Sequence, residues 1–101
     1  GLGALLLGYY DGDELVYAGK VGTGFDTATL RSLHKRLSRS ERDSTPISRG
    51  QIREASAHWV APTSVAQVAF SEWTRDGKLR HPRYLGLRTD KSPGDVVRES
   101  R

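Results

Sequence analysis

The 101-residue sequence predicts one small domain of mostly antiparallel strands with a single main helix. Two turn signals, each between two strand-like segments, predict two hairpins. One longer segment shows the helical spacing of leucines, and the remaining segments are too short or too interrupted for a second main helix. The sequence contains no cysteine, which excludes disulfides, thiolate zinc sites and cysteine nucleophiles.

The first predicted hairpin occupies the start of the chain. Residues 3–10 are rich in Leu and Tyr and predict a strand, and residues 14–21 predict a second one. Between them, Asp11-Gly12-Asp13 carries the Asp-Gly pattern that is typical of tight hairpin turns. Glycines at the end of the second strand indicate a bend or bulge where the sheet curls. They are Gly19, Gly22 and Gly24.

The helix is predicted over residues 27–39, with Asp26 or Thr27 as its N-cap. Leu30, Leu33 and Leu37 recur at i, i+3 and i+7, which gives a narrow apolar stripe. Residues 40–57 are rich in Ser and Arg and show no clean period. We therefore expect a basic, mobile connection there, with a short helical turn at residues 51–55.

The second half of the chain predicts the remaining strands. An extended segment begins at His58 and is interrupted by Pro62, which places it at an edge or a bulge. Residues 65–73 form the most strand-like segment of the chain. Residues 75–78 form the second turn, and residues 79–87 the returning strand, with Pro82 outside the hydrogen-bonded ladder.

The tail, residues 92–101, predicts a short C-terminal helix over residues 93–100. Ser92 stands at the N-cap, Pro93 at the first helical position and Asp95 in the first turn. About five curled strands and one main helix favour a five-stranded oligonucleotide-binding barrel, the OB-fold. An SH3-like barrel is the second candidate, and the helix over residues 27–39 counts against it.

The charge distribution favours a polyanionic partner. The net charge is +4 with a pI near 9.8. The first 30 residues carry one basic and four acidic side chains, whereas residues 31–101 carry 15 basic and eight acidic ones. Such a basic region is typical of nucleic-acid binders, although it also fits a solvated surface. The candidate DNA-binding residues are Lys20 and the helix side chains Arg31, Lys35, Arg36 and Arg39.

Motifs for self-contained catalysis are missing from the sequence. The stretch from Gly19 to Gly24 fails the phosphate-loop pattern, because Lys20 is followed by Val21. The three histidines lack carboxylates at ligand spacing, which predicts no metal site. The densest cluster of charge lies on the last predicted strand and just after it: Arg80, Arg83, Arg88, Asp90 and Lys91. It is consistent with a phosphate site or with a merely charged strand end.

The same cluster carries a family resemblance. Residues 80–91 read Arg-His-Pro-Arg-Tyr-Leu-Gly-Leu-Arg-Thr-Asp-Lys and resemble the final motif of ATP-dependent DNA ligases, whose core is Arg-x-Asp-Lys. Other segments resemble the same carboxy-terminal domain in matching order: residues 3–10, 17–25, 59–62 and 68–74. The resemblance spans nearly the whole chain and is strongest to the bacterial ligases of non-homologous end joining.

The resemblance implies an OB-fold domain that follows a nucleotidyltransferase domain, so that residues 1–101 are a fragment of a longer ligase. Arg88 and Lys91 would orient the pyrophosphate of ATP, with Asp90 positioning them and Arg80 and Arg83 supporting them. The nucleophilic lysine lies in the missing domain, so no catalytic residue is assigned to this fragment. The full-length enzyme would use ATP and Mg²⁺, whereas the isolated domain would bind neither and be inactive.

The implied partners are duplex DNA at nicks or ends and the adenylyltransferase domain of the same polypeptide. The longest apolar run, Ala4–Leu7, is too short for a membrane span, and we expect a bacterial, cytoplasmic and nucleoid-associated protein. The alternatives are a free-standing OB-fold module without a catalytic role and an RNA-binding adaptor. A Lys-x-Asp-Gly segment upstream of Gly1 would select the ligase.

Overall fold

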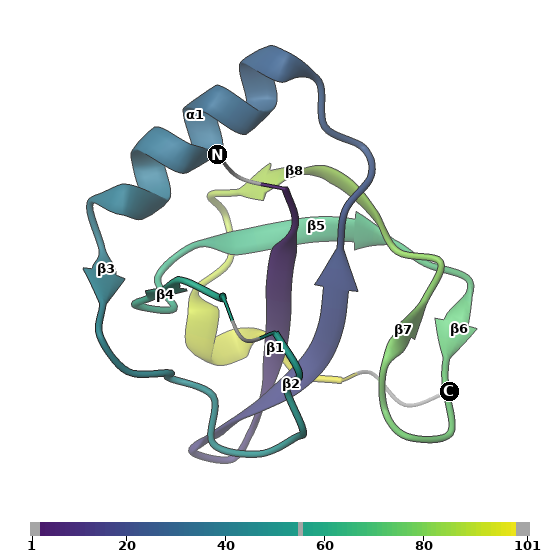
Figure 1. The fold of residues 1–101 in the computed structure, drawn as a ribbon. Coiled ribbons are helices and arrows are strands. Elements are labelled where there is room, and N and C mark those ends of the chain that lie inside the picture. Colours follow the sequence, from purple (N-terminus) through teal and green to yellow (C-terminus); the bar gives the residue numbers. More distant parts are fainter. Residues whose placement is uncertain (1–2, 55, 99–101) are drawn as a thin grey trace.

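The N-terminal hairpin is the longest ladder of the computed structural model, which describes residues 3–54 and 56–98 (Figure 1). Strand β1, Leu5–Asp11, pairs antiparallel with β2, Glu14–Val21, across the turn that contains Gly12. Gly12 has a φ of 63°, a left-handed conformation that suits glycine. The predicted hairpin is confirmed.

The predicted irregularity near Gly19 is a β-bulge. Leu7 lies opposite Gly19, but Gly8 lies opposite Tyr17, so Ala18 is an extra residue in the ladder. Gly19 has a φ of 116°, which a residue with a side chain rarely adopts. A bulge increases the local twist of the hairpin, and it thereby turns the end of β2 toward the helix.

The main helix, α1, spans Thr27–Ser38. Asp26 is its N-cap, and the carboxylate accepts a hydrogen bond from the Thr29 amide at 2.7 Å. This bond holds the pKa of Asp26 below its ordinary value. Leu33 is buried on the inner face of the helix, as the leucine spacing predicts.

The predicted strands over residues 65–73 and 79–87 are each interrupted. The structure has β5, Val65–Ala69, and β6, Glu72–Trp73, then β7, Leu79–Arg80, and β8, Arg83–Arg88. The second break occurs because His81 has a φ of 54° and Pro82 lacks an amide hydrogen. As a result, β5 pairs with β8 while β6 and β7 form a separate hairpin, visible at the right of Figure 1.

The connection over residues 40–57 is attached to the rest of the fold. Strand β3, Glu41–Arg42, pairs with β4, Trp59–Val60. Further along, the Ser48 amide donates to the Leu15 carbonyl at 2.8 Å, and the Tyr17 amide donates to the Arg49 carbonyl at 2.9 Å. Residues 51–54 do not form the predicted helical turn, and Ala55 lies outside the described residues. The mobility of this connection remains a prediction.

The strands form four separate two-stranded ladders in the described part of the chain. The mostly β architecture with one helix is therefore confirmed, but these ladders do not close by hydrogen bonds into the predicted five-stranded barrel. Val21 from β2, Leu33 from α1 and Tyr84 from β8 form a cluster within the buried core, and Phe25 stacks on Tyr84 with 4.7 Å between ring centroids. Side-chain packing thus joins ladders that share no hydrogen bonds.

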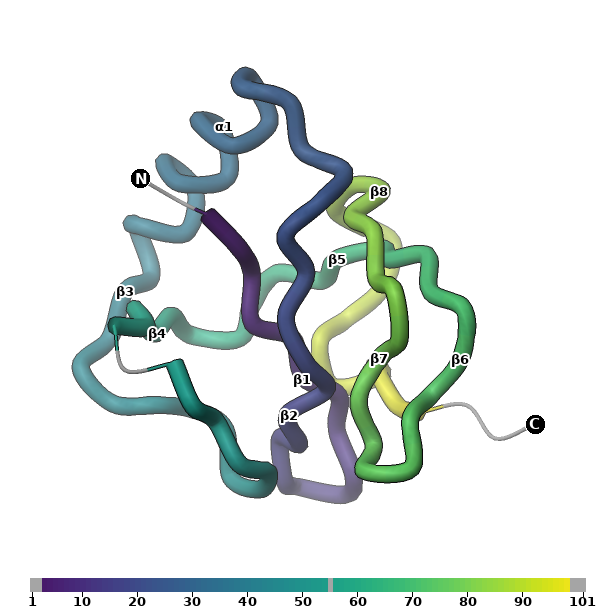
Figure 2. Tube along the Cα trace, turned by 45° about the vertical axis from the view of Figure 1, so that its right-hand side comes forward, coloured from purple at the N-terminus to yellow at the C-terminus, as the bar shows by residue number. Residues whose placement is uncertain are grey.

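The predicted C-terminal helix is reduced to a single 3₁₀ turn, Pro93–Asp95 (η1). Pro93 occupies the first helical position as predicted, but the Ser92 side chain makes no capping hydrogen bond. Residues 96–98 lie in no helix or strand, and Figure 2 shows this tail passing from η1 toward the β6–β7 hairpin. Residues 99–100 of the prediction lie outside the described residues. Within the described ranges, no helix has the length and apolarity needed to cross a membrane.

Candidate functional site

Arg88 stands at the end of β8 and is held by the carboxylate of Asp90. Arg88 Nε donates to Asp90 Oδ1 at 3.1 Å, and Nη2 donates to Oδ2 at 2.8 Å. This two-point contact raises the pKa of Arg88 and lowers the pKa of Asp90. Because a guanidinium has five N–H groups, three remain available for a second anion.

Lys91 completes the cluster three residues beyond Arg88. Its side chain is half-buried, and within the described residues it takes part in no ion pair. The family resemblance implies that Asp90 positions both cations, and the structure pairs Asp90 with Arg88. The Arg88–Lys91 motif, residues 88–91, therefore combines one arginine held in place with one lysine whose position depends on the backbone.

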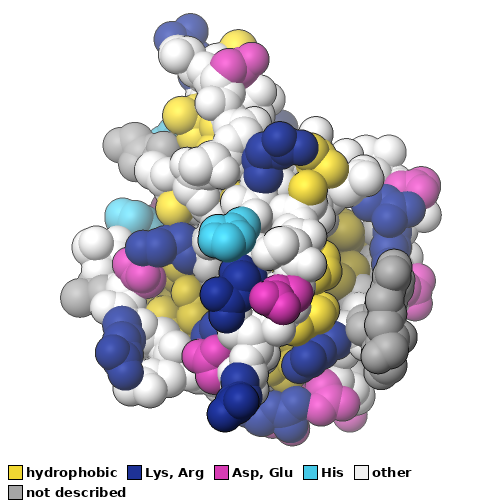
Figure 3. Space-filling view, turned by 90° about the vertical axis from the view of Figure 1, so that its right-hand side faces the viewer, with side chains coloured by type: hydrophobic (Ala, Val, Ile, Leu, Met, Phe, Trp, Pro, Cys, Tyr) yellow, Lys and Arg dark blue, Asp and Glu magenta, His cyan; other side chains and the backbone are white. Residues whose placement is uncertain are grey.

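Arg83 begins β8 and Arg80 ends β7, so both lie away from Arg88 at the far end of β8. Arg83 and Arg88 are five positions apart along the strand, a distance of roughly 16 Å. Arg80 Nε is 3.3 Å from Glu72 Oε2 across the β6–β7 hairpin. Figure 3 shows that Lys and Arg are interspersed with Asp and Glu on this face. The structure thus does not gather the supporting residues around the Arg88–Lys91 motif.

The outer face of α1 carries basic residues in a row. Arg31, Lys35 and Arg39 recur every four residues, and their positions lie on the side of the helix away from buried Leu33. We call these three residues the outer ridge. It extends roughly 12 Å along the helix axis. The sequence of α1 contains no acidic residue, and none of the ion pairs among the described residues involves the ridge.

The other two candidate DNA-binding residues point elsewhere. Arg36 Nε donates to Ser64 Oγ at 3.3 Å, which turns this side chain from α1 toward the start of β5. Lys20 Nζ lies 3.2 Å from Glu54 Oε1. Among the five candidate DNA-binding residues, the three of the outer ridge are the ones with no side-chain partner among the described residues.

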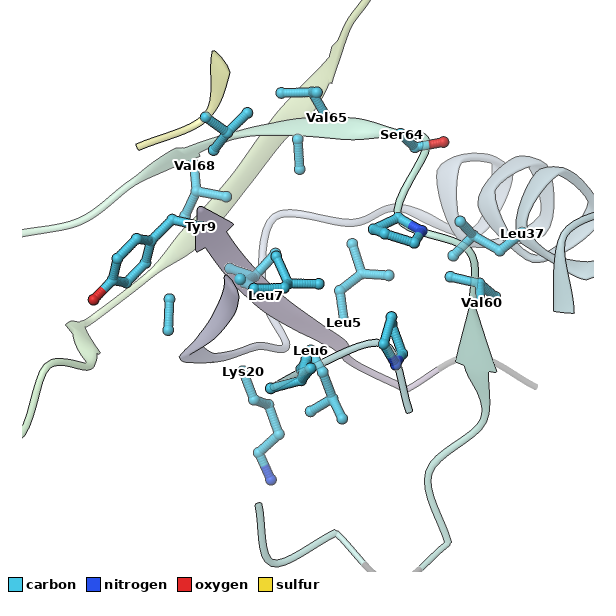
Figure 4. A pocket seen from close by; sticks show the side chains of 18 of the residues that line it. Leu5, Leu6, Leu7, Tyr9, Lys20, Leu37, Val60, Ser64, Val65 and Val68 are labelled. Carbon is cyan, nitrogen blue, oxygen red and sulfur yellow. The ribbon is translucent and has the colours of Figure 1, made fainter. Parts of the chain in front are cut away.

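Lys20 also lies at the edge of a cavity of about 580 Å³. Figure 4 shows apolar side chains from β1 and β5 around it, among them Leu5, Leu7 and Val68, with the Lys20 amine pointing away from them. The motif residues Arg88 and Lys91 do not line this space. The cavity is therefore lined mainly by apolar residues and is separate from the Arg88–Lys91 motif.

Sequence reasoning missed the contact that joins the segment between β2 and α1 to β8. The Tyr84 amide donates to the Thr23 carbonyl at 2.9 Å, and Gly24 has a φ of 95°. A side chain at Gly24 would place its first carbon 2.3 Å from the Tyr84 carbonyl oxygen. The Gly-Thr-Gly spacing at residues 22–24 was the available signal, and it reports a close backbone approach rather than a phosphate loop.

The arrangement suits recognition of phosphate oxygens by charge. Across residues 3–54 and 56–98, no three His, Asp or Glu side chains gather in a way that could hold a metal ion. Two sets of candidate cations remain for such recognition, the Arg88–Lys91 motif and the outer ridge. Planar arginine groups and mobile lysine amines are the side chains that bind phosphates most often.

Comparison with known proteins gives a consistent family. The model of a family described as the C-terminal region of ATP-dependent DNA ligases matches residues 1–91. The multifunctional non-homologous end joining protein LigD of Mycobacterium bovis is 41% identical over 98% of this chain and 13% of its own length. The LigD protein of Pseudomonas aeruginosa is also 41% identical, over 97% of this chain and 12% of its own length. The chain thus spans about one-eighth of the curated relatives it matches.

A solved structure shares the fold as well as the sequence. The crystal structure of the ligase domain of Mycobacterium tuberculosis LigD matches with a TM-score of 0.88 and 40% identity, over 96% of this chain and 32% of that one. A mycobacterial DNA ligase D complexed with ATP and MES matches with a TM-score of 0.85 and 40% identity, over 96% of this chain and 33% of that one. The chain therefore belongs to the family of C-terminal regions of ATP-dependent DNA ligases, close to those of the bacterial LigD proteins.

Proposed function

We propose that this chain is the C-terminal OB-fold domain of an ATP-dependent DNA ligase, in which it assists adenylylation of the catalytic lysine and grips duplex DNA. The observation that carries the proposal is the paired arginine at the end of β8. Asp90 fixes Arg88 through two hydrogen bonds and leaves its other N–H groups free. Membership in the ligase family gives that arginine its proposed substrate, the pyrophosphate of ATP.

The proposed chemistry needs only charge and position from this chain. In the first step, a lysine nitrogen of the adenylyltransferase domain attacks the α-phosphorus of ATP, and the bond to the β-phosphate breaks. Negative charge accumulates on the departing pyrophosphate, which Arg88 would hold at two oxygens and Lys91 would neutralise. Phosphoryl-type transfer depends largely on such positioning and neutralisation. The lysine nucleophile and the Mg²⁺ ligands are assigned to the adenylyltransferase domain.

The outer ridge supports the second half of the proposal. Three cations in a row on one helix face attract a phosphate backbone without reading its sequence. The relatives in Mycobacterium and Pseudomonas are named as non-homologous end joining proteins, and we infer the same repair setting for this chain. In this proposal the isolated domain is inactive, acts in the bacterial cytoplasm, and works only beside its adenylyltransferase domain.

The test separates the first step from the last in the polypeptide that carries both domains. Changing Arg88 or Lys91 to Ala should slow single-turnover adenylylation by roughly 30- to 1,000-fold, on the scale of losing one transition-state donor. Sealing of a nick that already carries 5′-AMP should change little, because pyrophosphate has left by then. Arg75→Ala, an exposed turn residue, controls for the loss of one charge.

Two results would contradict the assignment. An equal loss in both steps would indicate that the motif grips DNA rather than pyrophosphate. Unchanged rates in both steps would leave the motif as a charged strand end, and would favour a free-standing binding module. The thermal midpoint should stay close to that of the parent protein, because surface substitutions usually change stability by no more than about 0.5 kcal/mol.

A further inference from the structure

The C-terminal segment Ser92–Arg98 follows the Arg88–Lys91 motif directly and is anchored at its far end. The 3₁₀ turn is closed by the Asp95 amide on the Ser92 carbonyl at 3.0 Å and the Val96 amide on the Pro93 carbonyl at 3.1 Å. The carbonyl of the same residue, Val96, accepts a hydrogen bond from the Tyr10 amide of β1 at 2.7 Å. The matched family region ends at residue 91, so these contacts lie beyond it.

A second anchor lies on the β6–β7 hairpin. The guanidinium carbon of Arg98 is 4.6 Å from the ring centroid of Trp73, within the range of a cation–π contact. Trp73 is itself packed edge-on against Tyr9 and Phe70, with ring centroids at 5.5 and 5.6 Å. The tail therefore ends on an aromatic cluster that belongs to strands β1 and β6 and to the residue after β5.

These anchors restrict the position of Lys91 more than that of Arg88. Arg88 is fixed by its ladder position opposite Val65 and by Asp90. Lys91 lies outside the ladder and has no ion-pair partner among the described residues. The backbone on its two sides is what places it: β8 before it and the anchored tail after it. A short segment held at both ends samples far fewer conformations than one held at a single end.

We infer that residues 92–98 form a positioning strap for Lys91, with Arg98 on Trp73 as its side-chain anchor and Val96 on Tyr10 as its backbone anchor. This inference rests on the proposed role of Lys91 in adenylylation. Arg98, Trp73 and Tyr10 are positioning residues, because they touch neither ATP nor the reacting atoms. They affect the rate of adenylylation by changing the fraction of molecules in which Lys91 has the position needed to bind pyrophosphate.

The experiment uses the polypeptide that carries both domains. Arg98→Ala should slow single-turnover adenylylation by about two- to five-fold, the range of an exposed cation–π contact expressed as a rate. Arg98→Lys should restore most of the rate, because an ammonium group also binds over an indole ring. Sealing of a 5′-adenylylated nick should not change. Hydrogen exchange in a peptide that contains Tyr10 should become faster in Arg98→Ala.

A double variant distinguishes positioning from a general structural role. If Arg98 acts through Lys91, the variant with both Lys91→Ala and Arg98→Ala should adenylylate no more slowly than Lys91→Ala alone. Multiplicative losses, or an equal loss in the sealing step with a lower thermal midpoint, would overturn the strap. An unchanged rate in Arg98→Ala would also overturn it. Arg75→Ala, on the turn of the same hairpin, is the charge control.

The outcomes separate this inference from the proposed function. If Lys91→Ala slows adenylylation but Arg98→Ala does not, the proposed function stands and the strap is wrong. If Lys91→Ala leaves adenylylation unchanged, the role of the lysine is wrong and the strap is wrong with it. Both proposals are supported if each single variant slows adenylylation and the double variant is no slower than Lys91→Ala alone.

Discussion

The end of β8 and the outer face of α1 are both cationic, but they hold their charges differently. Arg88 is paired with an acid two residues away, which fixes its guanidinium in one orientation. The outer ridge Arg31, Lys35 and Arg39 has no acid within its own helix. The first region limits the freedom of one charge, whereas the second spreads three flexible charges along a line.

The difference matches two kinds of anion. A small phosphate group must be held at particular oxygens, and an oriented fork of N–H groups does this with little loss of side-chain entropy. A nucleic-acid backbone offers many equivalent phosphates, so long flexible side chains can bind it in many arrangements. Acidic residues beside the outer ridge should therefore weaken DNA binding by neutralising its charges. Loss of the acid beside Arg88 should instead weaken phosphate binding by freeing the guanidinium to rotate.

The largest effect that tests this comparison comes from Asp90→Asn. Without the carboxylate, Arg88 loses its fixed orientation, and we expect single-turnover adenylylation to fall by roughly ten- to 100-fold. Sealing of a preadenylylated nick should stay near the parent rate. Asp43→Asn, at an exposed position in the connection, is the matched control. A parental adenylylation rate in Asp90→Asn would show that Arg88 needs no partner, and the comparison would fail.

The next effect concerns the close contact between the segment before α1 and the start of β8, the two elements that carry these regions. Gly24→Ala introduces a side chain at a φ of 95° and forces its first carbon to 2.3 Å from the Tyr84 carbonyl oxygen. We expect the free energy of unfolding to fall by about 2–4 kcal/mol, measured by denaturant titration. Gly22→Ala is the control, because its nearest atom would be Ala4 Cβ at an ordinary 3.8 Å. Equal stabilities of the two variants would contradict this packing.

A smaller effect is expected from neutralising the outer ridge. Changing Arg31, Lys35 and Arg39 to Ala should weaken binding to nicked duplex DNA by roughly tenfold near physiological salt, and lower the salt slope of log K by about 3. Adenylylation should be unaffected. The control removes three exposed arginines elsewhere: Arg42, Arg53 and Arg75. If both triple variants lose the same affinity, the ridge has no special role.

The smallest effect is a pH dependence of α1. The Thr29 amide lowers the pKa of Asp26 in the folded state, so its stabilising contribution is present above the ordinary pKa and lost as pH falls through the lowered one. The thermal midpoint should therefore drop more in acid for the parent than for Asp26→Asn, by about one to three degrees. Asn caps helices without a charge and so provides the pH-independent reference. Identical acid profiles would show that the cap does not titrate.

Local chemistry explains which parts of the fold the sequence predicted. The hairpin turn at Gly12, the cap at Asp26 and the bulge at Gly19 each depend on the residue and its near neighbours. The place of the Arg88–Lys91 motif at a strand end follows from the strand pattern before it. All of these features were predicted because their causes lie within a few residues.

Long-range contacts explain what was missed. The connection lies along β2 because the Ser48 amide reaches the Leu15 carbonyl, a pairing that no local period indicates. The break at His81 depends on a left-handed backbone that few non-glycine residues adopt. Arg80 was grouped with Arg88 because the two are close in sequence. In the structure, β8 separates them, and Arg80 pairs with Glu72 across the β6–β7 hairpin. Pairing partners of charged side chains were thus the least predictable part of the candidate site.

The core made by Val21, Leu33 and Tyr84 has a consequence for how the chain folds. Val21 and Leu33 are synthesised early, whereas Tyr84 is synthesised only with β8, the last strand of the domain. Until then, the cluster of the hairpin and helix lacks the side chain that completes it, and the final ladder must close a long loop. Chains that stop before β8 would leave these faces in water, where such intermediates tend to aggregate. Folding of this domain is therefore completed at its C-terminal end, by the same strand that carries Arg88.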